Sequence, residues 1–397
     1  MDTRMTGVEL LDSGQRFAVT MWEYSWLVQR SGKQAEYADW DKVLDELVER
    51  GYDCIRIDAF PHCIAKDANG KVLDEVTFLP IPDNFMWGNH EPVTVNVRDG
   101  LIEFMKKIKE RGLYVGLSSW YNDDSEHRKL MIKSPQDYSR IWLETLDFIA
   151  EHDLLDIVVW VDLCNEFPMA IWSPHAYADV IGMEYEKSKS LRGLLRYIRQ
   201  WDEEAIARAS NYFNQGIDAV RSKYPDLKYT YSFQAIGSKN LVQTDTSAFD
   251  LAEPHIWATD SVGWTLRSKH LQAFLGSYPQ GVVSHANKSM KLYPKYKDKI
   301  YRILDERTDF WAEWAGKQNL PLITSEGWCS VMYEDISHNG FVGEWDWFKE
   351  VSEMGVRLAV EKGWNGICTS NFCQPHFEGM WHDVEWHREM TDLIRNG

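Results

Sequence analysis

Two glutamates stand where an apolar segment of the sequence gives way to a loop. Glu166 follows the apolar run at 156–162, and Glu326 follows the run at 321–325. A lone carboxylate at such a position is usually solvated and carries little information. Two carboxylates that face each other can share the work of nucleophile and acid, as hydrolysis of a glycosidic bond requires. Their meaning therefore depends on whether the fold brings them together.

Short apolar runs alternate with long amphipathic segments along the chain. The runs are rich in β-branched and aromatic residues, as is typical of strands buried on both faces. They lie at 17–22, 52–57, 114–118, 156–162, 228–233, 249–256, 321–325 and 366–370. Helical patterns cover 39–50, 97–111, a segment that begins at Ser134-Pro135, 201–223, 296–317, 345–362 and 383–395. After Phe233 the helical pattern is weak.

Eight strands alternating with seven or eight helices predict an α/β fold, a (β/α)8 TIM barrel. A doubly wound sheet is the alternative, but no glycine-rich phosphate loop follows the first run. The longest loops, 60–96, 167–200 and 255–294, follow strands, so we expect them at the C-terminal face of the barrel. No linker divides the sequence, which predicts a single catalytic domain over residues 1–397.

Runs four and seven lie across a barrel from each other, so Glu166 and Glu326 can meet over its mouth. Retaining glycoside hydrolysis needs two carboxyl groups about 5–5.5 Å apart. One attacks the anomeric carbon, and the other protonates the leaving oxygen and then activates water.

The Asn165-Glu166 pair and Glu326 resemble the motifs of clan A of the retaining glycoside hydrolases, which includes the family 5 cellulases. The resemblance covers nearly the whole chain as an architecture and a few short motifs at residue level. It implies that Glu166 is the acid/base, that Glu326 is the nucleophile, and that Asn165 binds the 2-hydroxyl of the sugar. No cofactor and no metal are implied.

Arg56, near the end of the second run, resembles the arginine that pairs with the nucleophile in that clan. A guanidinium there would hold Glu326 ionised, whereas a less polar setting would keep Glu166 protonated. The alternative is a buried salt bridge between Arg56 and Asp58 or Asp162.

Two positions depart from the family pattern. His255-Ile256-Trp257 stands where family 5 enzymes often carry His-x-Tyr, and Phe372, or else Trp381, stands where a tryptophan usually forms the floor of the sugar site. These departures indicate a distant branch, similar to the cellulase-like proteins, with an altered sugar specificity.

Tryptophan is abundant, with 19 residues, and flat aromatic faces suit rings of sugars. Trp120 and Trp328 are candidates for stacking on a sugar, and we include Trp22, His255 and Trp257 among the candidate substrate-binding residues. Core packing is the alternative for the tryptophans.

The 43 basic and 61 acidic residues give a net charge of −18, which argues against nucleic acid or an anionic membrane as a partner. No apolar run approaches the roughly 20 residues that span a bilayer. The first residues lack the apolar core of a secretory signal, so we expect a cytoplasmic protein, or a secreted or periplasmic one already trimmed. The expected partner is a carbohydrate substrate, and the oligomeric state is left open.

Three other readings compete with this one. A metal-dependent barrel enzyme would draw on His62, His255, His376, Asp58 and Glu253, although no H-E-x-x-H spacing is present. The second reading is a sugar-binding barrel without catalysis. The third is a zinc site built from Cys63, Cys164, Cys329 and Cys373, although the six cysteines show no C-x-x-C motif.

Overall fold

Parallel strands form the centre of the computed structural model, which describes residues 4–31, 35–67, 69–82, 85–234, 238–258, 262–330, 332–334 and 343–397. Seven strands follow the order β7-β6-β5-β2-β1-β11-β9, and every neighbouring pair is parallel. Their bounds are β1 Phe17–Met21, β2 Cys54–Asp58, β5 Tyr114–Ser118, β6 Val158–Asp162, β7 Tyr229–Thr230, β9 Ile323–Thr324 and β11 Gly366–Cys368. Each lies in one of the predicted apolar runs, except that β2 ends at Asp58, one residue beyond its run.

The segment around residues 252–257 closes the sheet into a ring. Phe233 and Pro254 form a parallel bridge on one side, and Ala252 and Leu322 form another on the other side. Beyond these bridges, β8 (Ile256–Trp257) pairs in parallel with β10 (Gly327–Trp328). The run at 249–256 therefore supplies the missing strand between β7 and β9, and the predicted (β/α)8 barrel is confirmed.

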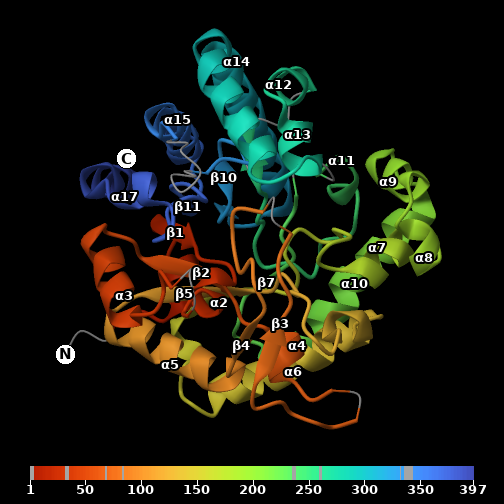
Figure 1. Ribbon diagram of the computed structural model, residues 1–397. Coiled ribbons are helices and arrows are strands. Elements are labelled where there is room, and N and C mark those ends of the chain that lie inside the picture. The colour runs from red at the N-terminus through yellow and green to blue at the C-terminus, as the bar shows by residue number, and fades with distance from the viewer. Residues whose placement is uncertain are drawn as a thin grey trace.

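Helices surround this ring of strands (Figure 1). They are α3 Trp40–Glu49, α5 Val97–Glu110, α6 Pro135–Ala150, α10 Glu203–Arg221, α14 Gln280–Gln318, α15 Asp346–Glu361 and α17 Val384–Asn396. Side-chain oxygens cap several of their N-termini, which satisfies backbone N–H groups that have no partner within the helix. The capping residues are Asp39, Asn96, Ser134, Asp202 and Asp383.

The helix α14 is longer than the sequence pattern indicates. It begins at Gln280 rather than near residue 296, and Pro294 lies inside it. Proline removes one backbone hydrogen bond and usually marks a helix end. Here the apolar face continues on both sides of it, with Val282 and Ala286 before Pro294 and Leu304 after it, all buried.

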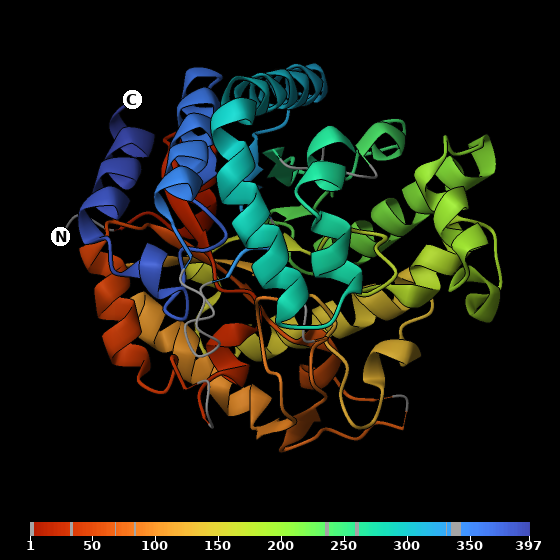
Figure 2. The same ribbon diagram turned by 45° about the horizontal axis from the view of Figure 1, so that its top comes forward.

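The connections between strands carry further short elements (Figure 2). The loop after β2 holds α4 Pro61–Ile64 and the antiparallel pair β3 Val76–Phe78 and β4 Val93–Val95. The loop after β6 holds α7 Pro174–Val180, α8 Tyr185–Ser188 and α9 Leu191–Ile198, and α11 Ser238–Leu241 follows β7. The remaining ones are α1 Gly7–Asp12, α2 Ser25–Val28, η1 Arg128–Met131, η2 Leu155–Ile157, α12 Val262–Arg267, α13 His270–Leu275 and α16 Glu378–Trp381.

Many tryptophans fill the core rather than line a surface. The fully buried ones are Trp22, Trp26, Trp40, Trp142, Trp160, Trp264, Trp328, Trp364 and Trp381. All six cysteines are buried as free thiols, and among the described residues Cys63, Cys164, Cys329 and Cys373 form no common cluster. Within the described part of the chain, no helix is both long enough and apolar enough to traverse a lipid bilayer.

Candidate active site

Arg56 lies in the middle of β2, and its side chain has no exposed surface. Its guanidinium nitrogens lie 2.8 Å from Glu326 Oε1, 2.7 Å from Asp162 Oδ2, 3.2 Å from Glu253 Oε1 and 2.8 Å from Asn165 Oδ1. Burial alone would lower the pKa of Arg56, but the three surrounding carboxylates raise it above its usual value. The guanidinium is therefore a fixed positive charge.

Both contacts that the sequence analysis considered for Arg56, one with Glu326 and one with a buried aspartate, are present. The guanidinium contacts Glu326 and also forms a buried salt bridge with Asp162. Asp58 is not part of it, because its carboxylate accepts the backbone N–H groups of Phe60 and Trp120 instead.

Glu166 and Glu326 are near neighbours at the mouth of the ring. One carboxylate oxygen of each and one ring nitrogen of His255 all lie within 4.8 Å of one another. His255 Nδ1 is 3.0 Å from Glu166 Oε1 and 3.4 Å from Glu326 Oε2. The glutamate side chains are only 14% and 8% exposed, so the reacting groups sit in a largely enclosed space.

The surroundings of Glu166 favour its protonated form. The residue has a left-handed backbone with φ of 48°, and its N–H donates to Ser232 Oγ at 2.8 Å. Burial raises the pKa of Glu166 to about 7, with Asp162 adding to the rise and Arg56 opposing it. The carboxyl group is thus partly protonated near neutral pH.

Glu326 has stronger support for its ionised form. Burial and the neighbouring Glu166 raise its pKa, while His255 and a direct hydrogen bond from Arg56 lower it. Asn371 adds a donor, since its Nδ2 lies 3.4 Å from Glu326 Oε2. Burial lowers the pKa of His255 to about 4, so its ring is neutral and Nδ1–H can donate to either glutamate.

Glu253 was missed by the sequence reasoning as a partner of Arg56, whereas Asp162 was named there as one alternative partner. Glu253, considered only as a metal ligand, accepts from Trp160 Nε1 at 2.8 Å and from Ser325 Oγ, and it contacts Arg56. Asp162 accepts the backbone N–H of Ser232 at 2.9 Å. Glu253 lies within the predicted apolar run at 249–256, and the run alone does not show which of its residues face Arg56.

A hydrogen-bonded chain leads from Glu326 to a buried acid at the end of β1. Asn371 Oδ1 accepts the N–H of Gly327 at 2.7 Å, and its backbone oxygen accepts from Gln374 Nε2 at 3.1 Å. Gln374 Nε2 also donates to Glu23 Oε2 at 2.8 Å. Burial raises the pKa of Glu23 to about 8. These hydrogen bonds connect the loop after β11 to the loop after β1, next to Glu326.

The other predicted substrate-binding residues divide into two groups. Asn165 and Trp120 contact Arg56, whose guanidinium carbon is 4.5 Å from the ring centroid of Trp120, and Trp257 lies buried in β8. Trp22 and Phe372 have no exposed surface and pack against other protein rings.

Trp328 also lies in the core rather than in the mouth. Its indole nitrogen donates to the Cys368 carbonyl at 2.8 Å, and its ring packs directly on Gly355 of α15. The expectation of a stacking surface at Trp22, Trp328 and Phe372 is therefore not carried further, because large apolar rings next to a strand end are buried between layers here.

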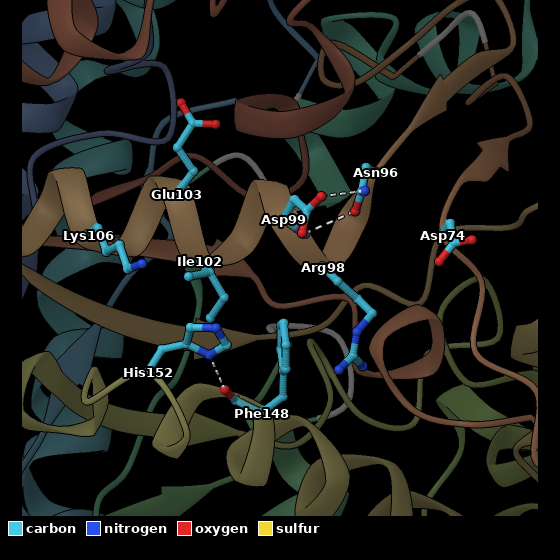
Figure 3. Close-up of a pocket in the computed structure, with 9 residues that line it drawn as sticks. All are labelled: Asp74, Asn96, Arg98, Asp99, Ile102, Glu103, Lys106, Phe148 and His152. Atoms are coloured by element: carbon cyan, nitrogen blue, oxygen red, sulfur yellow. Dashed lines mark hydrogen bonds between the residues drawn. The ribbon is translucent and has the colours of Figure 1, made fainter.

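A separate cavity of about 510 Å³ lies outside the barrel, against the outer face of α5 and the end of α6 (Figure 3). Some of its polar groups have protein partners: Asn96 Oδ1 accepts the N–H of Asp99, and His152 Nδ1 bonds the Phe148 carbonyl at 2.8 Å. No catalytic pair faces this cavity among the described residues that line it.

The fold is that of the glycoside hydrolase barrels, and the carboxylate pair at its mouth fits a glycosidase at this general level. The chain belongs to the family of sugar-binding cellulase-like proteins, whose model matches residues 19–395. No curated protein sequence matches it. The resemblance to cellulase-like and family 5 proteins is thereby confirmed as one of family and fold.

Solved structures agree with this assignment. A candidate glycoside hydrolase from Parabacteroides distasonis ATCC 8503 is 34% identical, with 96% of this chain and 94% of that chain covered and a TM-score of 0.82. A GH5-4 broad-specificity endoglucanase from an uncultured bacterium is 11% identical, with 100% and 98% covered and a TM-score of 0.50. An endo-β-1,4-mannanase from Thermotoga petrophila is 10% identical, with 98% and 78% covered and a TM-score of 0.51. The last two share the fold alone.

Proposed function

We propose that this protein is a retaining glycoside hydrolase in which Glu326 is the nucleophile and Glu166 the acid/base. The observation that carries the proposal is the pair of carboxylate oxygens within 4.8 Å, with Arg56 bonded to Glu326 and not to Glu166. Carboxyl groups stand about 5–5.5 Å apart in retaining enzymes and about 6.5–9.5 Å apart in inverting ones, so the close approach of these two oxygens supports double displacement.

In the first step, a carboxylate oxygen of Glu326 attacks the anomeric carbon and the glycosidic C–O bond breaks. Glu166 gives its proton to the departing oxygen, so the sugar becomes an ester of Glu326. In the second step, ionised Glu166 takes a proton from water, the hydroxide oxygen attacks the same carbon, and the ester bond breaks. Glu166 ends protonated and Glu326 ionised, as both began.

The residues around the two glutamates support their proposed roles. Arg56 and the amide of Asn371 favour the ionised form of Glu326 before the attack. The neutral ring of His255 donates one hydrogen bond within reach of both glutamates. Asn165 is held by Arg56 through its oxygen, which leaves its NH2 group as the donor for a sugar hydroxyl.

The low exposure of both glutamates favours small substrates. Side chains that are 14% and 8% exposed admit the end of a glycoside or short oligosaccharide more readily than the middle of a long polymer. Oligosaccharides or short glycosides are therefore the proposed substrate class.

A metal-dependent reaction is the second candidate, because Glu166, His255 and Glu326 are close enough to hold an ion. The positive charge of Arg56, 2.8 Å from Glu326, opposes a second cation at that place. Activity that is unchanged by a chelator would count against this candidate, and activity restored only by added metal would establish it.

The test is a panel of nitrophenyl glycosides assayed with Glu326→Gln and Glu166→Gln. Each variant keeps the shape of the side chain but removes the carboxylate, so turnover should fall by about 10³-fold or more while the circular dichroism spectrum is unchanged. Glu103→Gln, on the exposed face of α5, is the matched control and should keep full activity. Normal turnover in either site variant would refute the assignment, and sugar binding with no turnover by the wild type would favour the non-catalytic reading.

A further inference from the structure

His62, Cys63 and Asp124 form a second cluster of metal-ligating side chains, outside the candidate active site. His62 and Cys63 lie in α4, after β2, and Asp124 lies in the loop after β5. One ring nitrogen of His62, the Cys63 sulfur and one Asp124 oxygen all lie within 4.8 Å of one another. His62, Cys63 and Asp124 are 4%, 0% and 1% exposed, so the cluster is shielded from bulk solvent.

The hydrogen bonding of His62 leaves one nitrogen available. Nε2 lies 2.9 Å from the backbone oxygen of Asn122, and a carbonyl can only accept, so Nε2 carries the hydrogen. Nδ1 therefore holds a lone pair, and it is buried without a hydrogen-bond partner among the described residues. Ligating histidines commonly donate their other N–H to a backbone carbonyl in this way.

Asp124 is also oriented by its surroundings. Oδ1 accepts the N–H of Glu126 at 2.7 Å, and Oδ2 accepts the N–H of Arg128 at 3.1 Å. Such bonds fix a carboxylate without using all of its lone pairs. Asn122, in the same loop, has a buried amide whose oxygen and nitrogen are both unpartnered in the described chain, which offers a further oxygen donor.

The charges at this place suit a divalent cation. A thiolate of Cys63 together with the carboxylate of Asp124 would neutralise two positive charges. Arg128 is the neighbouring cation, and its guanidinium contacts Glu126 at 3.5 Å and the His62 carbonyl at 3.4 Å.

We propose that His62 Nδ1, Cys63 Sγ and an oxygen of Asp124 bind a zinc ion that joins the loop after β2 to the loop after β5. A mixed nitrogen, sulfur and oxygen donor set favours zinc over magnesium or calcium. On binding, the Sγ–H bond of Cys63 breaks, the sulfur forms a bond to zinc, and the proton passes to solvent. The role is structural, because the ligands do not include Glu166 or Glu326 and the ion would hold the backbone that follows Trp120.

The test uses the full chain, stripped with a chelator and reloaded with zinc or cobalt. Elemental analysis after gel filtration should find about one zinc per chain in the wild type and less than about a tenth of that in Cys63→Ser. Cobalt should give a sulfur-to-cobalt charge-transfer absorption that Cys63→Ser lacks. Cys164→Ser is the matched control, another fully buried free thiol, and should behave as the wild type.

The alternatives give distinct results. No zinc in the wild type would overturn the proposal, and so would equal zinc in the wild type and Cys63→Ser, which would place the ion elsewhere, such as at Glu166, His255 and Glu326. Should Cys63→Ser fail to fold, Asp124→Asn serves as the second variant with the same expected loss. Thermal melting of the wild type, but not of the variant, should shift upward on zinc addition.

Discussion

Glu166 and Glu326 are both buried and share the neighbour His255, yet the groups beyond that histidine differ. Arg56 and Asn371 donate to Glu326, whereas the raised pKa of Glu166 has burial as its main cause and Asp162 as a further one. A shared histidine with unequal flanking charges separates the proton affinities of two carboxylates that stand close together. This inequality, rather than the presence of two glutamates, supports their different proposed roles.

The pH dependence of activity should reflect this inequality. Glu166 must carry a proton to act as the acid, and its pKa is about 7, so kcat/KM should fall as the pH rises through about 7. Glu326 must be ionised, and its raised pKa places the acidic limb above the usual 4.5. Because Glu166 and Glu326 interact, the apparent pKa values of the acidic and alkaline limbs describe the pair and not either residue alone.

The check is the pH profile of the wild type beside Glu166→Gln, on an aryl glycoside whose leaving group needs little protonation. The variant should lose the alkaline limb. A wild-type profile that is flat between pH 6 and 9 would contradict the acid role of Glu166.

At the scale of elements, the packing of β5 against β6 supports the charged centre. A Cβ at Gly116 of β5 would lie 2.3 Å from the Trp160 ring of β6, and Trp160 Nε1 donates to Glu253, which holds Arg56. The glycine is needed for this close approach rather than for an unusual backbone angle. The absence of a side chain at Gly116 thus lets the Trp160 ring reach Glu253 in the middle of the barrel.

Gly116→Ala should therefore destabilise the protein and lower its activity together. Overpacking of this kind costs about 1–3 kcal/mol of unfolding free energy. Gly316→Ala is the matched control: it lies in α14 with no atom within 4 Å of the added carbon, and it should stabilise by about 0.5–1 kcal/mol. Denaturant unfolding measures both values, and equal effects of the two substitutions would contradict this account of β5.

The elements that the sequence predicted best are those with strong local patterns. The runs that became β1, β2, β5 and β6 and the capped helices were recognisable because burial on both faces and polar caps leave local signals. The sixth run was also predicted, but β10 is only a short pairing at Gly327 and Trp328, so no periodicity could define it. The roles of Glu253 and Asn371 depend on neighbours distant in the chain, which spacing alone does not supply.

At the scale of the whole molecule, several buried carboxyl groups have raised pKa values. They are about 8 for Glu23 and about 7 for Asp58 and Glu166, with burial as the main cause in each. Such groups bind protons more tightly in the folded than in the unfolded state. Their contribution to stability is therefore full at low pH and is lost as the pH rises from about 4.5 toward 8.

The unfolding free energy should accordingly decrease between about pH 7.5 and 8.5, where histidines are largely neutral in both the folded and the unfolded state. Each such group contributes a slope of up to about 1.4 kcal/mol per pH unit. Glu23→Gln cannot ionise, so its slope should be less steep than that of the wild type. Urea unfolding across this range is the measurement, and stability that rises with pH would show that these carboxyl groups are not protonated in the fold.

The stereochemistry of the first product tests the central proposal most directly. Proton NMR, recorded early in the hydrolysis of a glycoside that the protein accepts, distinguishes the two anomers before they equilibrate. Attack by Glu326 followed by attack of water inverts the anomeric carbon twice, so the product should have the configuration of the substrate. A product of opposite configuration would mean that water attacks directly and that Glu326 forms no bond to the sugar.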